Sequence, residues 1–244
     1  MSDALQRMLS PKSIAIVGVS SDFNKLNGRP MKFLLDKNAD VIAYPAPLEG
    51  ESLARSIVAP HLDGTQEEVS IRMPMVVERF PAEEVYDWAA ETLGAHLRAG
   101  RDVVYLCEGD PFVYGSFSYL YERMVDQYEV QVIPGVSSVM ACAAALGTAL
   151  ATRSDVLGIV PATLAEDELR ERLQGLEAMA IIKVGRHLDK VRRVLASLEL
   201  LEQAHYVERA TFDNEQTMKL SAFDGSVAPY FSMILVHRRG YAWC

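Results

Sequence analysis

One loop constrains the fold of this chain more than any other stretch of its sequence. Residues 103–107, Val-Val-Tyr-Leu-Cys, form an apolar run with the length of a buried strand. Beyond the loop, apolar residues have the spacing of one helix face: Phe117, Leu120, Tyr121 and Met124. The loop, residues 108–117, therefore lies at the carboxyl end of a strand, where open α/β sheets bind ligands. The alternative is an ordinary turn between a strand and a helix, with Asp110 and Pro111 marking the start of the helix.

Segments with strand and helix patterns alternate along the chain, which predicts an α/β fold. A length of 244 residues is enough for two small domains, and the pattern is weakest over residues 147–153. We therefore expect two domains, residues 1–148 and 149–244, each a mixed sheet with flanking helices. The helices are expected over residues 31–37, 51–58, 81–98, 117–124, 137–146, 165–173 and 186–198.

Three strand patterns follow one another near the end of the chain without an intervening helix. They cover residues 205–209, 217–222 and 230–237. Strands joined by short connections pair antiparallel, so we expect this arrangement beside the sheet of the second domain.

The composition excludes several classes of protein. A net charge of −9 argues against general nucleic-acid binding, because neutralising phosphates requires a basic surface. No apolar run reaches the roughly 18 residues of a membrane-spanning helix. Cys107, Cys142 and Cys244 lack the spacing of a metal site, and the histidines are dispersed. We therefore expect a cytoplasmic protein without disulfide bonds, metal or membrane contact.

Two segments carry a resemblance to a known family. Residues 108–117, Glu-Gly-Asp-Pro-Phe-Val-Tyr-Gly-Ser-Phe, and residues 133–138, Ile-Pro-Gly-Val-Ser-Ser, resemble motifs of the tetrapyrrole methylases. The similarity extends with few gaps over residues 40–238. It implies a two-domain tetrapyrrole-methylase-like fold, a homodimer, and methyl transfer from S-adenosylmethionine to a ring carbon in corrin synthesis. We expect the two loops to follow neighbouring strands and to form one slot for the methyl donor.

The first forty residues fit the family less well. The family has a loop with a Gly-Pro-Gly-Asp core after its first strand, whereas this chain has Gly18 followed by Val-Ser-Ser-Asp at residues 19–22. Residues 11–35 are instead faintly similar to the CoA-binding segment of NDP-forming acyl-CoA synthetases. Either the native loop has drifted in sequence, or a foreign segment has replaced it and the cofactor site lacks part of one wall.

The resemblance also implies which residues bind the cofactor, S-adenosylmethionine. The carboxylate of Asp110 is expected to accept hydrogen bonds from an ammonium or hydroxyl group of the ligand, or to cap the following helix. The serines of the second loop are expected to add hydroxyl and backbone contacts, and residues of the second domain to close over the adenine. The full set is Glu108, Gly109, Asp110, Tyr114, Ser137, Ser138, Val184, His205 and Tyr206.

The implied tetrapyrrole substrate is a polyacid, so basic side chains are candidates for binding its carboxylates. Arg72 and Arg79 flank an apolar segment suited to the rim of a macrocycle site. Alternatively, both arginines are solvated or paired with acidic neighbours, namely Glu67, Glu68 and Glu78. Five basic residues between positions 183 and 193 supply a local positive surface that the net charge does not. The expected substrate ligands are Arg72, Arg79, Ser116, Lys183 and Arg186.

Methyl transfer from a sulfonium to an electron-rich carbon needs alignment of the reactants and exclusion of water more than covalent catalysis. This explains motifs that are rich in glycine, proline and serine and contain no catalytic triad. The ring carbon must later lose a proton, and His187 and Glu208 are conceivable bases. Nothing in the sequence singles out either residue, so the proton acceptor stays unassigned.

Three functions remain open from the sequence. The segments Tyr-Gly-Ser-Phe, residues 114–117, and Pro-Tyr-Phe-Ser-Met-Ile-Leu, residues 229–235, favour the branch of the family that methylates C20 of precorrin-2. A cobalt-containing substrate or another ring position is the alternative within the family. A protein that binds a tetrapyrrole or a nucleotide without catalysis is the third, because the glycine-rich loop is altered.

Overall fold

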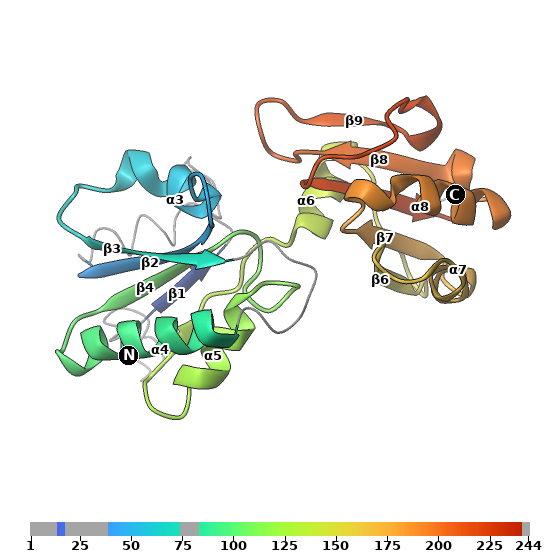
Figure 1. Cartoon of the computed structure of the whole chain (residues 1–244). Coiled ribbons are helices and arrows are strands. Elements are labelled where there is room, and N and C mark those ends of the chain that lie inside the picture. The colour runs from blue at the N-terminus through green and yellow to red at the C-terminus, as the bar shows by residue number, and fades with distance from the viewer. Residues whose placement is uncertain (1–13, 18–38, 74–82, 241–244) are drawn as a thin grey trace. The chain divides into compact units, whose positions relative to one another are not determined.

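The structure, a computed structural model, describes residues 14–17, 39–73 and 83–240, and for residues 14–17 the main chain alone. The chain divides into two units, of which the first ends at Ser137 and the second begins at Ser138 (Figure 1). This division precedes the boundary expected at residue 148, because α6 (Ser138–Leu146) packs on the sheet of the second unit. The expected helix 31–37, the loop 19–22 and Arg79 lie outside the described residues.

The first unit contains a five-stranded sheet in the order β3-β2-β4-β1-β5. All of the described pairings are parallel, so the carboxyl ends of the strands meet at one edge of the sheet. The two loops with family motifs begin at this edge, after β4 and after β5. The strands are β1 (Ile14–Val17), β2 (Val41–Pro47), β3 (Glu67–Met73), β4 (Val103–Cys107) and β5 (Gln131–Val132).

Apolar side chains fill both faces of this sheet. Tyr105 of β4 belongs to a cluster with residues of α4 (Glu83–Arg98) and α5 (Phe117–Met124). Leu106, the next residue, belongs to a cluster with Ala54 and Val58 of α3 (Leu53–Val58). A strand that is covered on both faces requires a continuous run of apolar residues, whereas a strand covered on one face alternates polar and apolar residues. This explains why all residues of β4 are buried and apolar.

The second unit contains the sheet β6-β7-β10-β8-β9, in which β6 and β7 are parallel and the other pairs are antiparallel. The antiparallel pairing expected at the end of the chain is confirmed, within the sheet rather than beside it. The mixed sheet expected of each domain is confirmed here, whereas the described pairings of the first sheet are all parallel. The strands are β6 (Leu157–Pro161), β7 (Ala178–Ile182), β8 (Ala204–Glu208), β9 (Gln216–Lys219) and β10 (Ser232–His237).

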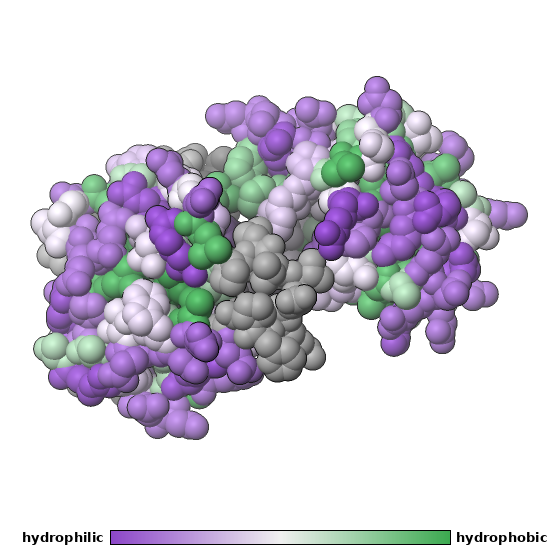
Figure 2. Space-filling model, in the orientation of Figure 1, coloured by the Kyte–Doolittle hydropathy of each residue, from purple (hydrophilic) through white to green (hydrophobic). Residues whose placement is uncertain are grey.

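Helices cover both faces of the second sheet. Leu169 of α7 (Glu166–Gln174) and Val191 of α8 (Leu188–Ser197) are fully buried on one face, and Val139 of α6 is buried on the other. Hydrophilic residues cover most of the visible surface of each unit, with small hydrophobic patches between them (Figure 2). No helix within the described ranges combines the length and the apolarity that crossing a membrane requires.

Candidate functional site

The carboxylate of Asp110 joins the two loops that carry the family motifs. Its Oδ2 atom accepts a hydrogen bond of 3.0 Å from the main-chain nitrogen of Gly135, and its Oδ1 atom accepts one of 3.0 Å from the nitrogen of Phe112. The expectation that β4 and β5 are neighbours is wrong, because β1 lies between them in the sheet. The loops nevertheless meet, since the Asp110 side chain of the first loop accepts a hydrogen bond from Gly135 of the second.

Asp110 does not cap the helix that follows it. Helix α5 begins at Phe117 with Ser116 as its N-cap residue, and the Ser116 side chain makes no capping hydrogen bond. The bond from Phe112 to Asp110 instead closes an Asx turn at the start of the loop. Each carboxylate oxygen can accept more than one hydrogen bond, so Asp110 retains acceptor capacity for a ligand.

Glycines are required at two points of the first loop for different reasons. Gly109 has φ +75°, and among the described residues a Cβ atom added to it would meet nothing closer than the main-chain oxygen of Val136, at 4.0 Å. The described part of the chain therefore leaves space beside this main chain. At Gly115, an added Cβ would lie 2.7 Å from the main-chain oxygen of Pro111, which is closer than real atoms approach. Tyr114 also has positive φ, 56°, and it is exposed.

Glu108 connects the first loop to α3. Its Oε1 atom accepts a hydrogen bond of 3.2 Å from the main-chain nitrogen of Ala54, in the first turn of α3. Although part of the residue is exposed, desolvation of the carboxyl group raises the pKa of Glu108, and the bond from Ala54 acts in the opposite direction. The second loop, residues 133–137, enters α6, with Ser137 half-buried and Ser138 exposed.

Two side chains that were expected to contact the adenine of the cofactor are buried inside the protein. Val184 is fully buried, and so is Tyr206, whose ring stacks on Phe223 with 4.2 Å between ring centroids. The Tyr206 hydroxyl group donates to Oε2 of Glu208 at 2.8 Å. The main chain of Tyr206 lies between β10 and β9 in the sheet, and the main-chain oxygen of Val184 accepts a hydrogen bond of 2.7 Å from the nitrogen of His187. His205 is half-buried, and desolvation lowers its pKa.

Three of the five basic residues between positions 183 and 193 bind other parts of the protein. Lys190 donates to the main-chain oxygen of Leu164 at 2.5 Å, and Arg193 pairs with Glu166 at 2.8 Å. Arg192 donates to the main-chain oxygens of Gly225, at 2.7 Å, and Phe223. Hydrogen bonds to main-chain oxygens leave the charges of Lys190 and Arg192 in place, so the ion pair of Arg193 with Glu166 reduces the expected local positive charge without removing it. Lys183 and Arg186 are exposed.

Neither conceivable base is singled out by its surroundings. Both oxygens of the Glu208 carboxylate are engaged, since Arg209 donates to Oε1 and Tyr206 to Oε2. Desolvation lowers the pKa of His187, and Lys190 and Arg186 lower it further. A lowered pKa favours the neutral form that a base requires, but no geometry among the described residues assigns this role to His187.

Arg72 contacts main-chain oxygens rather than acidic residues. Its Nη1 atom donates to Pro47 at 2.9 Å, to Leu48 at 3.1 Å and to Gly50 at 3.4 Å. The proposed pairing with Glu67 and Glu68 is wrong, because those carboxylates pair with Arg101 and Arg55.

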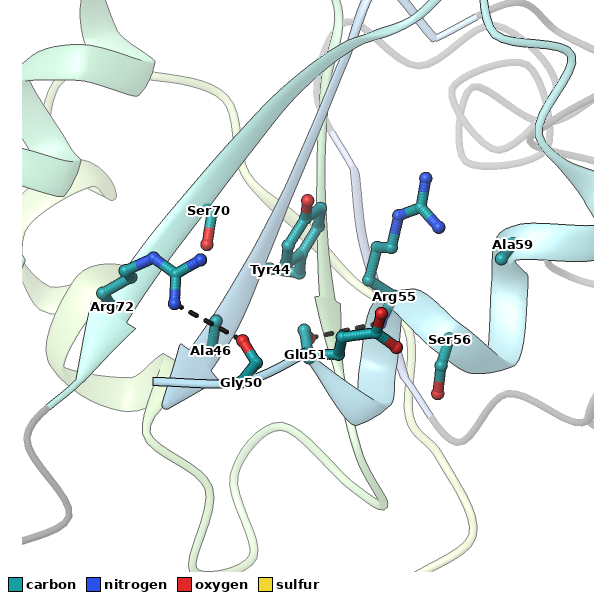
Figure 3. A pocket seen from close by; sticks show the side chains of 10 residues that line it. Tyr44, Ala46, Gly50, Glu51, Arg55, Ser56, Ala59, Ser70 and Arg72 are labelled. Carbon is teal, nitrogen blue, oxygen red and sulfur yellow. Dashed lines mark hydrogen bonds between the residues drawn. The ribbon is translucent and has the colours of Figure 1, made fainter. Parts of the chain in front are cut away.

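Arg72 also lines a cavity of about 340 Å³ between α3 and the strands β2 and β3 (Figure 3). Ser70, which lines the same cavity, was not among the residues singled out from the sequence. The alternation of Glu68, Ser70 and Arg72 with apolar residues along β3 is the signal that could have found it. Ser116, an expected substrate ligand, is the half-buried N-cap residue of α5.

Comparisons with known proteins agree with these features. A family model described as tetrapyrrole (corrin/porphyrin) methylases matches residues 35–224. A precorrin-2 C(20)-methyltransferase of Sinorhizobium sp is 39% identical over 206 residues, which are 81% of this chain and 84% of the relative. A cobalt-precorrin-2 C(20)-methyltransferase of Salmonella typhimurium is 30% identical over 203 residues, 82% of this chain and 86% of the relative.

A longer relative and a solved structure extend the comparison. The cobalamin biosynthesis protein CobIJ of Mycobacterium tuberculosis is 36% identical over 206 residues, 81% of this chain, and this match spans 41% of the relative's length. A uroporphyrin-III C-methyl transferase from Thermus thermophilus, complexed with S-adenyl homocysteine, has a TM-score of 0.64 and 22% identity, covering 92% of this chain and 97% of that chain. This last likeness shows a common fold.

Proposed function

The chain belongs to the tetrapyrrole (corrin/porphyrin) methylase family, and from this premise we propose that it methylates C20 of precorrin-2, with S-adenosylmethionine as methyl donor. That it is a methyltransferase follows from the family and from the names of relatives at 30% identity and above. The product would be precorrin-3A, in cobalamin biosynthesis. The 39% identity to a C20-methyltransferase supports the ring position.

The observation that carries the proposal is the junction of the two motif loops at Asp110. A methyl donor and a macrocycle must be held at a short distance, and alignment of this kind contributes up to roughly 7–11 kcal/mol. The hydrogen bonds from Phe112 and Gly135 fix the carboxylate between two glycine-containing loops before any ligand binds. A site that is ordered in advance loses less conformational entropy when it binds its ligand.

The residues around Gly109 fit S-adenosylmethionine. The open space beside this residue lets a ligand approach the main chain, which a Cβ atom would prevent. When bound, the cofactor supplies a methyl group on a sulfonium, which is a good leaving group. Asp110 has acceptor capacity for an ammonium or hydroxyl group, and Glu108 and Tyr114 flank it in the same loop. The remaining residues that the family resemblance implies as cofactor ligands are Ser137, Ser138, Val184, His205 and Tyr206.

The residues of the protein align and shield the reactants rather than form a covalent bond. We propose that Arg72, Lys183 and Arg186 bind carboxylates of the substrate, because a guanidinium or ammonium group forms charge-assisted hydrogen bonds with them. We propose that the hydroxyl group of Ser116, at the N-cap of α5, adds a further contact to the substrate. The base that removes the proton from C20 stays unassigned.

Calorimetric titration with S-adenosylhomocysteine, followed by anaerobic incubation with precorrin-2 and labelled S-adenosylmethionine, tests the proposal. We expect micromolar binding and a product heavier by one methyl group. Mass spectrometry of ring fragments locates the new methyl group at C20. If S-adenosylhomocysteine does not bind, the result favours the alternative function, a protein that binds a tetrapyrrole or a nucleotide without catalysis.

A cobalt-containing substrate is the second candidate. It is favoured by the relative from Salmonella typhimurium, whose name specifies cobalt-precorrin-2. The lower identity of that relative, 30% against 39%, makes the metal-free substrate our first choice. Parallel assays with precorrin-2 and its cobalt complex, compared by kcat/KM, decide between them.

We further propose that the protein acts in the cytoplasm as a homodimer, as the family resemblance implies. The buried, unpaired thiols of Cys107 and Cys142 agree with a reducing compartment. Light scattering coupled to size-exclusion chromatography distinguishes a dimer from a monomer of 27.0 kDa.

A further inference from the structure

The cavity in the first unit lies near the carboxyl ends of two strands. Arg72 is the next to last residue of β3, and Ala46 is the next to last residue of β2. Helix α3 forms another wall, and the same helix contacts the first loop through the bond from Ala54 to Glu108. The cavity and the first motif loop therefore share one helix and one edge of the sheet.

The alternation of side chains along β3 points polar groups into this cavity. Val69 and Ile71 belong to the apolar cluster with α4, so Ser70 and Arg72 face the opposite side of the strand. Within the described part of the chain, the Ser70 hydroxyl group makes no hydrogen bond. A half-buried donor next to an arginine is suited to binding an anion.

Arg72 is held in position by one of its two terminal nitrogens. Nη1 donates to the main-chain oxygens of residues 47, 48 and 50. Among the described residues, Nε and Nη2 have no hydrogen-bond partner. These two groups form the side of the guanidinium that binds a carboxylate with two parallel hydrogen bonds. The arginine is thus fixed in place and keeps this side open.

The second arginine of the cavity is already neutralised. Arg55 binds Glu68 through Nε, at 3.0 Å, and through Nη2, at 2.9 Å. The hydroxyl group of Tyr44 donates to the same carboxylate at 2.7 Å. Arg72 therefore supplies the positive charge of the cavity, and Glu51, an exposed lining residue, opposes it.

We propose that this cavity binds one carboxylate-bearing side chain of the tetrapyrrole substrate, with Nε and Nη2 of Arg72 and the hydroxyl group of Ser70 as donors. The inference rests on the proposed function and adds to it the recognition of a particular substituent. Small-molecule sites enclose about 300–1,000 Å³, so a cavity of about 340 Å³ suits one acidic arm rather than the macrocycle.

The test compares four variants by steady-state kinetics with precorrin-2. Arg72→Gln removes the charge, and we expect KM for precorrin-2 to rise about 10- to 100-fold while kcat changes little. Arg72→Lys keeps the charge but lacks the planar guanidinium group, so its KM for precorrin-2 is expected to lie between those of the wild type and Arg72→Gln. Ser70→Ala is expected to raise KM about 3- to 10-fold. Arg98→Gln removes an equal charge at the end of α4, before β4 begins, and should leave KM unchanged.

A fifth variant gives an effect of opposite sign. Glu51→Gln removes the negative charge that competes with the substrate carboxylate, so KM for precorrin-2 should fall about two- to fivefold. A purely structural role of the cavity predicts no such gain. A higher KM for precorrin-2 in Arg72→Gln together with a lower KM in Glu51→Gln is thus specific to binding of an anion in this cavity.

Two further readouts separate the inference from the proposed function. Calorimetry with S-adenosylhomocysteine and the melting temperature report the cofactor site and folding of each variant, and both should stay near the wild-type values. Absorbance titration of precorrin-2 measures its binding without turnover. Loss of wild-type methylation would overturn the proposed function. Unchanged precorrin-2 affinity in both Arg72→Gln and Ser70→Ala, with an active wild type, would overturn the role of the cavity.

Discussion

Oδ2 of Asp110 lies 3.0 Å from the main-chain nitrogen of Gly135, 25 positions further along the chain. This hydrogen bond connects two loops that leave the sheet on either side of β1. This side chain bridges the two loops, and we propose that it also binds the cofactor. Both roles can be measured separately.

Asp110→Asn tests the bridge. An asparagine amide presents one acceptor and one donor group, so one of the two amides, of Phe112 or Gly135, faces an NH₂ group instead of an oxygen. We expect the free energy of unfolding to fall by about 1–3 kcal/mol, measured by urea titration, and the affinity for S-adenosylhomocysteine to fall as well. Asp126→Asn, at an exposed position, is the control. Full cofactor affinity in Asp110→Asn would contradict the placement of this carboxylate in the site.

Gly109→Ala separates backbone strain from ligand contact. Both Gly109 and Gly147 have positive φ, and at either position an added Cβ meets no atom of the described residues closer than 4.0 Å. Alanine at each position should therefore cost a similar 1–2 kcal/mol, roughly, in unfolding free energy. Only Gly109→Ala is expected to weaken binding of S-adenosylhomocysteine in calorimetry, because its Cβ would fill the space left for the ligand. Equal affinities of the two variants would show that no ligand approaches this residue.

Tyr206→Phe tests whether Tyr206 acts in the core or in the cofactor site. Removing its hydroxyl group leaves Oε2 of the buried Glu208 without this donor, which should lower the unfolding free energy by about 1–3 kcal/mol. Cofactor affinity should be unchanged, because the ring is enclosed against Phe223. Tyr119→Phe, at an exposed residue, controls for loss of a hydroxyl group. A drop in affinity without a drop in stability would place the side chain at the ligand.

The pH dependence of stability should depend on Asp155. The main-chain nitrogen of Thr152 donates to its carboxylate at 2.9 Å, and His237 and Arg239 also bind it, so its pKa lies well below the ordinary value. A carboxyl group whose pKa is lower in the folded than in the unfolded protein stabilises the folded state at pH values above its ordinary pKa, near 4. This stabilisation is lost as the pH falls below that ordinary pKa.

Melting temperatures between pH 3 and pH 7 measure this effect. Asp155→Asn should melt below the wild type at neutral pH, and the difference should shrink as the pH falls through the acidic range. Asp213→Asn, at an exposed position, should melt with the wild type at every pH. A difference in melting temperature that does not depend on pH would show that the charge of Asp155 contributes nothing to stability.

Hydrophobic periodicity is sufficient to predict most elements of this fold, because each strand or helix must bury its own apolar face. The run 103–107 is buried on both faces of the sheet, and the apolar stripe of α8 is buried as its spacing requires. Strand order is different, since it depends on which backbones pair in three dimensions. The insertion of β1 between β4 and β5 could not be read from local pattern.

The candidate site was predictable where a residue type is demanded by the backbone. Gly109 and Gly115 are examples, because the turn excludes a Cβ or needs positive φ. Charged residues were less predictable, since their partners come from distant positions. Arg192 looked like part of a basic surface and instead binds the main-chain oxygens of a loop some thirty positions away.

The position of β1 inside the sheet, between β4 and β5, also has a consequence for how the first unit folds. Residues 14–17 pair with residues 104–107 on one side and 131–132 on the other, so this sheet closes only after long stretches of chain have come together. Contacts of such high sequence separation slow folding. Whatever the evolutionary origin of the N-terminal segment, it must contribute a strand at this place. A shortened protein that starts after residue 17 would leave β4 and β5 with exposed edges and a tendency to aggregate.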